Sequence, residues 1–248
     1  MGMWNSLRLL TLLLGGASLW WSITVLPIFR SAAPVRDATA RIMAGDLFKS
    51  GTLDEMLARF ESEPKSRMAE AAVVRARALV HLAVAELSMQ RKKPEEADGK
   101  AVAAENDLKF SLVTNPTDSF VWVLLYSVHL TRNGLDANTV RYLEESYATG
   151  PLEGWISLRR SRLALAAFSV LGAGAKEKVV SEFIDMVDSG FIDDTFAILT
   201  TVGWTHRDLL LSHLERADIL SREALARRLR REGIWVDVPG VKRSDRPW

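Results

Sequence analysis

The feature of this chain that most constrains its fold is an uncharged run of twenty-one residues, 9–29, which lies between two arginines. A helix of this length reaches about 30 Å, the thickness of the hydrocarbon core of a bilayer. Trp20, Trp21 and Phe29 lie toward its C-terminal end, where aromatic rings favour the membrane interface. The run therefore predicts one transmembrane helix, with residues 1–30 as an N-terminal anchor.

The alternative for this segment is a cleaved signal peptide, because the small residues Ser31, Ala32 and Ala33 follow the apolar run. Two features favour an uncleaved anchor. The run is longer than the roughly 7 to 15 residues of a signal-peptide core, and the segment before it carries a single arginine, Arg8.

The side of the membrane on which the remaining chain lies depends on two opposed indications. Positive charges close to the run are concentrated on its C-terminal side, which favours a cytoplasmic domain. They are Arg30, Arg36, Arg41 and Lys49, against Arg8 on the other side. A very short N-terminal tail before an apolar helix and a large domain is the usual layout of a bacterial signal anchor, and long domains translocate largely regardless of charge. We expect a single-pass inner-membrane protein with a periplasmic domain.

The rest of the chain, residues 31–248, is electrically balanced, with 30 Lys and Arg against 31 Asp and Glu. A general nucleic-acid binder would need a marked basic excess, so we expect no nucleic-acid partner. The chain has no cysteine, which removes disulfides and thiolate chemistry. Apolar residues recur at spacings of three and four, as Val73, Ala76, Leu79 and Val80 do, and this pattern predicts an all-α fold.

Turn residues divide this helical part of the chain. We expect a linker with short helices over 31–65, paired helices over 66–190, and C-terminal helices with a tail over 191–248. The paired helices are expected at about 68–89, 94–113, 120–131, 136–148, 152–171 and 176–188. Pro94 suits the first turn of the second of these helices.

A short repeat runs through the paired helices. Its positions hold small side chains and bulky side chains, followed by a proline that ends the helix pair. They are Ala104, Leu108, Ser111 and Pro116, then Trp122 and Leu125, and then Leu143, Ser146 and Pro151. This spacing resembles the tetratricopeptide repeat, a resemblance that implies a solenoid of antiparallel helix pairs over residues 66–190.

The chain departs from the tetratricopeptide pattern at four positions, two of which are Leu108 and Leu143, where the family usually has an aromatic residue. Tyr126 stands where the family has a small residue, and His129 stands where it has an aromatic one. We therefore expect a degenerate repeat, and the alternative is a generic helical bundle whose apolar stripes match the pattern.

Two phrases of the sequence, residues 45–53 (GDLFKSGTL) and 150–156 (GPLEGWI), the latter followed by 159–166 (RRSRLALA), carry a second resemblance. They resemble small single-pass bacterial membrane proteins with tetratricopeptide-like domains that are linked to exopolysaccharide production and secretion. The resemblance implies an accessory, non-catalytic role, and it carries no functional residues with it.

Motifs for catalysis or metal binding are missing from the sequence. The four histidines form no pair at metal-ligand spacing, and no cysteine could complete a site, so we expect no metal and no cofactor. His206-Arg207-Asp208 spells part of a kinase catalytic loop without the other kinase motifs. We therefore expect no catalytic residues and no enzyme, whereas a cleft with converging carboxylates or histidines would favour one.

Two groups of side chains are candidates for partner contact. The aromatic residues Trp122, Tyr126, Tyr142 and Trp155 are candidate anchors in a groove between helix pairs, or else core residues. The arginines are candidates for a charged surface that contacts lipid headgroups or an acidic glycan, because guanidinium groups bind carboxylates and phosphates bidentately. They are Arg159, Arg160, Arg162, Arg227, Arg228, Arg230 and Arg231, and the alternative is a solvated face paired with nearby glutamates.

These observations together predict a membrane-anchored scaffold or interaction module of the bacterial envelope, accessory to exopolysaccharide biosynthesis or export. Its partners would be the membrane, through residues 9–29, and other envelope proteins. The alternative is a chaperone-like assembly factor of another envelope pathway, such as cytochrome maturation.

Overall fold

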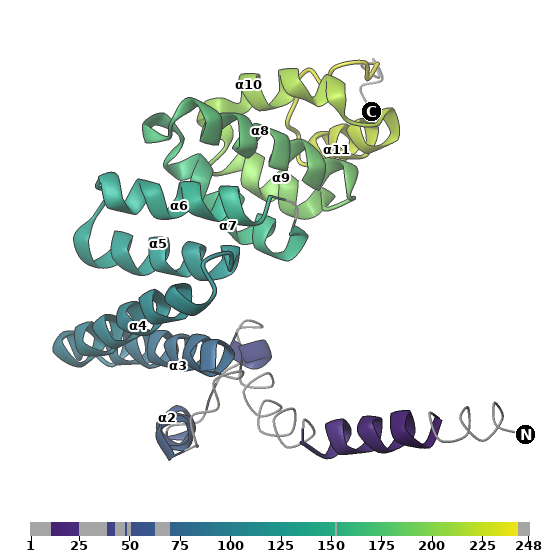
Figure 1. Cartoon of the computed structure of the whole chain (residues 1–248). Helices are drawn as coiled ribbons and strands as arrows, with labels where there is room; N and C mark the ends of the chain where they lie inside the picture. The colour runs from purple at the N-terminus through teal and green to yellow at the C-terminus, as the bar shows by residue number, and fades with distance from the viewer. Residues whose placement is uncertain are drawn as a thin grey trace, which may run out of the picture. The chain divides into compact units, whose positions relative to one another are not determined.

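A computed structural model of the chain describes residues 11–24, 39–42, 48, 51–62, 70–151 and 153–242. All regular secondary structure in these ranges is helical, which confirms the predicted all-α class (Figure 1). The chain divides into two compact units, residues 1–116 and 117–248, and each unit is described by itself. The boundary between them falls inside residues 66–190, the predicted repeat region.

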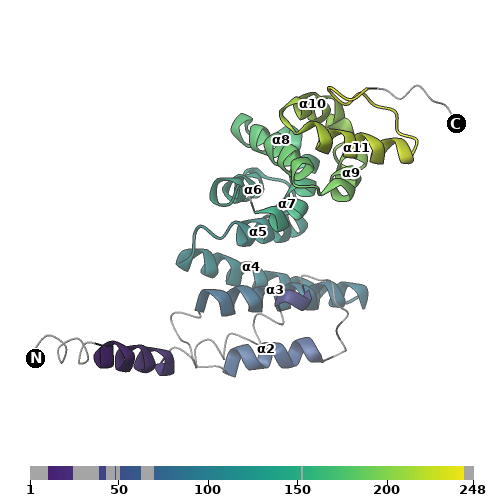
Figure 2. The same ribbon diagram turned by 90° about the vertical axis from the view of Figure 1, so that its right-hand side faces the viewer.

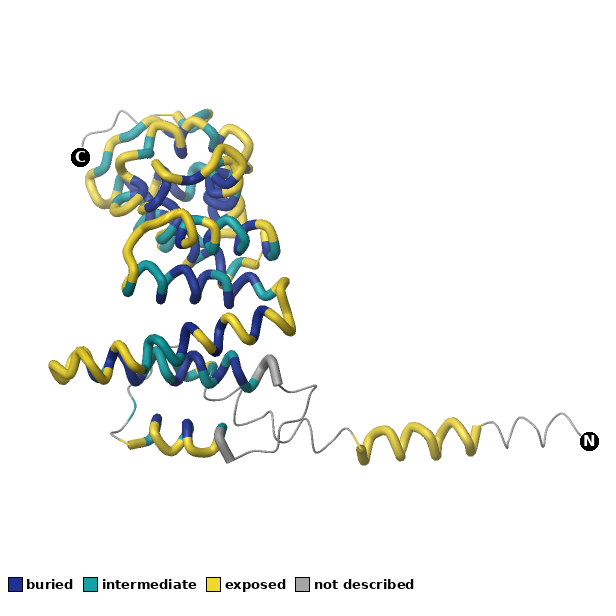
Figure 3. Tube along the Cα trace, turned by 60° about the vertical axis from the view of Figure 1, so that its left-hand side comes forward, coloured by how far each residue is buried: buried dark blue, intermediate teal, exposed yellow. Residues whose placement is uncertain are grey.

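The predicted anchor is described in its central part only. Residues 11–24 form a helix whose residues are all exposed (Figure 3). Residues 9, 10 and 25–29 lie outside the described residues. Among the helices that the structure describes, none combines the length and the apolar character needed to cross a bilayer.

The first unit also contains α2 (Thr52–Ser62), α3 (Glu70–Gln90) and α4 (Pro94–Thr114). The three-residue turn between α3 and α4 makes them an antiparallel hairpin, and Figure 2 shows them side by side. Pro94 lies in the first turn of α4, as predicted, where its missing N–H leaves no helical hydrogen bond unmade. Helix α2 packs on α3 through an apolar cluster that includes Leu53, Leu57, Val80 and Val84.

The second unit contains the remaining helices. They are α5 (Ser119–Asn133), α6 (Ala137–Thr149), α7 (Gly154–Ala166), η1 (Phe168–Val170), α8 (Ala173–Asp188), α9 (Ile192–Thr200), η2 (Trp204–His206), α10 (Arg207–Ser212), η3 (His213–Arg216) and α11 (Ile219–Arg231). Helix α5 packs on α6 and α7 packs on α8, while α5 also contacts α7 and α6 contacts α8. One continuous core joins these helices, with Phe183, Ile198 and Leu225 among its fully buried side chains.

The ends of α5 and α6 follow ordinary capping chemistry. The Asp118 carboxylate accepts a hydrogen bond from the backbone N–H of Val121 at the start of α5. Asp136 and Thr139 form a capping box at the start of α6, which satisfies backbone N–H groups at the helix end. Between them the chain turns at Gly134, whose φ of 80° favours glycine.

Gly150 lets the end of α6 approach the start of α5 closely. A Cβ atom at Gly150 would lie 2.5 Å from the Cβ of the buried Ser119. Ser146 strengthens the same contact, because its hydroxyl donates a hydrogen bond to the Ser119 carbonyl at 2.9 Å.

We expect the change Gly150→Ala to destabilise the protein by about 1–3 kcal/mol, because the added methyl group overpacks this contact. The matched control is Gly99→Ala in α4, where a Cβ would meet no atom within 4 Å. That control should instead stabilise the protein by about 0.5–1 kcal/mol, the usual difference between alanine and glycine inside a helix. Denaturant unfolding measures the free energy of unfolding of both variants. If Gly150→Ala were as stable relative to the unchanged protein as Gly99→Ala, the prediction would be contradicted.

Candidate interaction site

Two of the four aromatic candidates lie together. Trp122 of α5 and Tyr142 of α6 are half-buried, and their rings stack with centroids 6.0 Å apart. The His129 and Tyr142 rings form a T-shaped pair with centroids 5.4 Å apart. The structure therefore brings Trp122 and Tyr142 into one small aromatic group between paired helices.

The other two aromatic candidates lie apart from this group. Tyr126 is 2% exposed and belongs to the core, which corrects its assignment as a partner contact. Trp155 is 48% exposed at the start of α7 and rests on Phe120 with ring centroids 4.8 Å apart. Trp155 is thus the most accessible of the four.

The arginines of α7 divide between two faces of the helix. Arg159 and Arg162 are exposed, and among the described residues they form no ion pair. Arg160 is fully buried. The prediction that Arg160 belongs to a charged surface is therefore wrong, because it lies on the core-facing side of α7.

The arginines of α11 are partly engaged in ion pairs within the unit. Arg228 contacts Asp193 and Glu232, each at 2.6 Å, and its guanidinium lies over the Phe196 ring. Arg227 lies 3.5 Å from Glu223. Arg230 is half-buried and Arg231 exposed, and neither pairs with an acid among the described residues. Arg227 and Arg228 therefore fit the alternative of a solvated face whose arginines pair with nearby acids.

A buried ion pair between α7 and α8 holds the middle of the second unit together. The Arg160 guanidinium contacts the Glu182 carboxylate through Nη2, and Arg160 Nε donates to Glu182 Oε1 at 3.1 Å. The hydroxyls of Ser157 and Ser161, on α7, donate to the two oxygens of the same carboxylate at 2.7 and 2.9 Å. The carboxylate is therefore solvated by the protein in place of water.

The same arginine also reaches the end of α6. Its Nη1 donates to the carbonyls of Ser146 and Gly150 at 2.8 and 2.9 Å. The Ser146 carbonyl also accepts from the backbone N–H of Gly150 at 3.2 Å, so the arginine adds a second donor there. The Tyr147 hydroxyl donates to Glu182 at 2.9 Å. Burial raises the pKa of Tyr147 well above its usual value, and the charge of Glu182 raises it further. Arg160 thus ties α6, α7 and α8 to one another.

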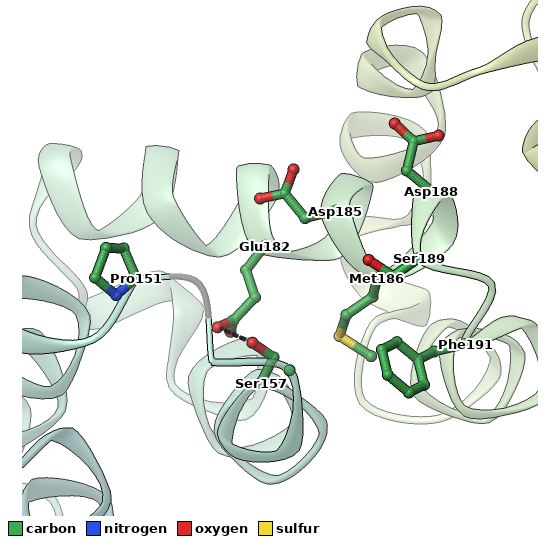
Figure 4. A pocket seen from close by; sticks show the side chains of 9 residues that line it. Pro151, Ser157, Glu182, Asp185, Met186, Asp188, Ser189 and Phe191 are labelled. Carbon is green, nitrogen blue, oxygen red and sulfur yellow. Dashed lines mark hydrogen bonds between the residues drawn. The ribbon is translucent and has the colours of Figure 1, made fainter.

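A pocket of about 270 Å³ opens beside this ion pair (Figure 4). It is lined by Pro151, Gly154, Ser157, Glu182, Asp185, Met186, Asp188, Ser189 and Phe191. In the view of Figure 4, Pro151 lies at one end and Met186 and Phe191 lie at the other, with the bonded pair Ser157 and Glu182 between them. The pocket therefore combines an apolar end with carboxyl groups.

The two other carboxylates of the pocket, Asp185 and Asp188, are exposed and form no ion pair within 4.0 Å among the described residues. Asp188 accepts a hydrogen bond from the backbone N–H of Asp218 at 2.8 Å. Desolvation raises the pKa of Asp185, the negative charges of Asp188 and Glu182 raise it further, and Arg216 opposes them. The pocket thus has a negative rim.

Sequence reasoning missed both the ion pair and the pocket. A signal for the ion pair was present: Glu182 lies between Val179 and Met186 on the apolar stripe of α8, where an acid needs a buried partner. No local pattern pointed to the pocket.

In the part of the chain that the structure describes, no group of three or more His, Asp or Glu side chains could hold a metal ion. In comparisons with known proteins, no family model, no curated protein and no solved structure matches this chain.

Proposed function

We propose that the protein is a membrane-anchored, non-enzymatic interaction module of the bacterial envelope. The observation that carries this proposal is the apolar helix at residues 11–24, in which every residue is exposed, including Trp20 at 73% and Trp21 at 68%. Exposing apolar surface to water costs roughly 25 cal/mol per Å², so an apolar environment that buries this helix would be strongly favoured. The sequence favours a lipid bilayer as that environment, because the uncharged run extends from residue 9 to residue 29.

The arrangement of the second unit supports an interaction module of paired helices. Helices α5 and α6 form one pair, and α7 and α8 form the next. The first helices of the two pairs, α5 and α7, contact each other, and so do the second helices, α6 and α8. Stacking of this kind is the principle of helical repeat proteins. The small and bulky repeat positions are buried, with Leu143 and Ser146 fully so, except Trp122, which is half-buried. These contacts support the tetratricopeptide-like reading over a generic bundle.

The biological setting of the proposal rests on resemblance. The phrases at residues 45–53 and 150–156 resemble anchored proteins linked to exopolysaccharide production, and we propose an accessory role in its biosynthesis or export. The domain after the anchor would lie in the periplasm. Trp122, Tyr142 and Trp155 remain the aromatic contacts proposed for envelope proteins. Arg159, Arg162, Arg230 and Arg231 remain the cations proposed for lipid headgroups or an acidic glycan.

Fractionation of membranes tests the anchor. We expect the full chain to stay in the membrane pellet after extraction with carbonate and with high salt, because a bilayer-spanning helix is held by apolar burial and not by charge. A chain of residues 31–248 should move to the supernatant. Release of the full chain by salt, or a mature N-terminus near Pro34, would contradict the uncleaved anchor.

A further inference from the structure

We propose that the pocket beside the Arg160–Glu182 ion pair binds the side chain of an arginine from a partner protein. This inference rests on the proposed function and deepens it, because it names the chemistry that the interaction module recognises.

The size of the pocket suits a single side chain. Its volume of about 270 Å³ lies just below the roughly 300–1,000 Å³ of sites that bury drug-sized ligands. Gly154 helps to keep it open, since a Cβ at this position would lie 3.4 Å from the Phe191 ring. A longer side chain at residue 154 would extend into this space.

The charges of the pocket favour a cationic occupant over an anionic one. Asp185 and Asp188 both lie in the last turn of α8, where the helix dipole already places partial negative charge. That turn has no basic residue, and neither carboxylate forms an ion pair within 4.0 Å among the described residues. Arg216 offsets only part of the negative charge at Asp185, whose pKa stays raised. Carboxylates at this end of a helix are locally unfavourable, and a bound cation would relieve both the dipole and their mutual repulsion.

The apolar end of the pocket selects among cations. Met186 and Phe191 offer a thioether and an aromatic ring, which suit the methylene stem and the planar face of an arginine. A guanidinium also presents several N–H donors in fixed geometry, so it could engage both aspartates, whereas an ammonium acts as a point charge. The combination of apolar wall and paired carboxylates thus favours arginine over a small inorganic cation.

The test uses the methyl group of Met186 as a local reporter. The full chain, labelled with methyl-¹³C methionine and held in detergent micelles, is titrated with Nα-acetyl-arginine amide, and the Met186 signal is identified by its loss in Met186→Leu. We expect a saturable shift of this signal. The lysine analogue should shift it more weakly, and the neutral citrulline analogue should not shift it.

Two matched variants assign the effect to the pocket. Asp185→Asn/Asp188→Asn should weaken the apparent affinity about tenfold. Glu177→Gln/Glu215→Gln removes the same charge from exposed positions outside the pocket and should leave the affinity unchanged. No saturable shift at Met186, or equal weakening by both variants, would overturn the proposal.

Failure of the pocket and failure of the interaction role can be told apart. If Met186 does not respond while the full chain still captures envelope proteins that a bare anchor does not, the pocket proposal is wrong and the interaction module stands. If Met186 responds but the full chain captures no such proteins, the assignment of a partner protein as the source of the cation is wrong.

Discussion

The change Arg160→Met is expected to destabilise the second unit by about 3–5 kcal/mol. The guanidinium is fully buried, and its removal leaves the Glu182 carboxylate charged in the core without its counter-ion. It also strips two donors from the carbonyls of Ser146 and Gly150 at the end of α6. Urea unfolding of the full chain in detergent, followed by tryptophan fluorescence, measures the change.

Arg159→Met is the matched control, because Arg159 is the exposed neighbour on the same helix. Its effect should stay within about 0.5 kcal/mol. Adding Glu182→Gln to Arg160→Met should recover part of the lost stability, because the amide removes the unpaired charge and keeps an acceptor for the Ser157 and Ser161 hydroxyls. Equal effects of Arg159→Met and Arg160→Met would show that the ion pair is not buried.

The change Tyr126→Ala is expected to destabilise the protein by a similar amount, about 3–5 kcal/mol, as for other large aromatic side chains removed from a core. Tyr126 is 2% exposed and packs in the same apolar cluster as Leu143. Burial also raises the pKa of its hydroxyl, which is consistent with a position away from water.

Trp155→Ala is the comparison for Tyr126, since Trp155 is 48% exposed. We expect Trp155→Ala to lower the free energy of unfolding by less than half as much as Tyr126→Ala and to leave the protein folded. A small loss would mean that the indole is available to a partner. The same unfolding measurement distinguishes the two. A larger loss of stability from Trp155→Ala than from Tyr126→Ala would contradict the placement of Tyr126 in the core and Trp155 at the surface.

Much of the helical framework could be predicted from local patterns, because capping and turn chemistry act over a few residues. Pro94 begins α4, and Gly134 ends α5 with the positive φ that glycine adopts. The expected helix over residues 152–171 was less accurate, because the chain breaks at Ala167 between α7 and η1. Nothing in the local sequence marks that break.

The errors at the candidate site have a common physical reason. A charged residue is predicted to be exposed when the sequence gives no sign of its partner on another helix. Arg160 lies on α7, and its partner Glu182 lies on α8. Ile156 and Ala164 flank Arg160 at spacings of four and are both buried, so helical periodicity placed the arginine on the inner face. The pocket depends on how the end of α8 meets the start of α7, which no pattern along one helix reports.

The central claim, a membrane-anchored interaction module, is tested most directly by crosslinking and affinity capture from membranes. Three chains are compared: the full chain, a chain whose residues 9–29 are replaced by an unrelated transmembrane helix, and residues 1–30 fused to an unrelated soluble domain. We predict that the first two enrich the same defined set of envelope proteins by mass spectrometry and that the third enriches none of them. Equal recovery of these proteins by the third chain, or no enrichment by the first, would contradict the account.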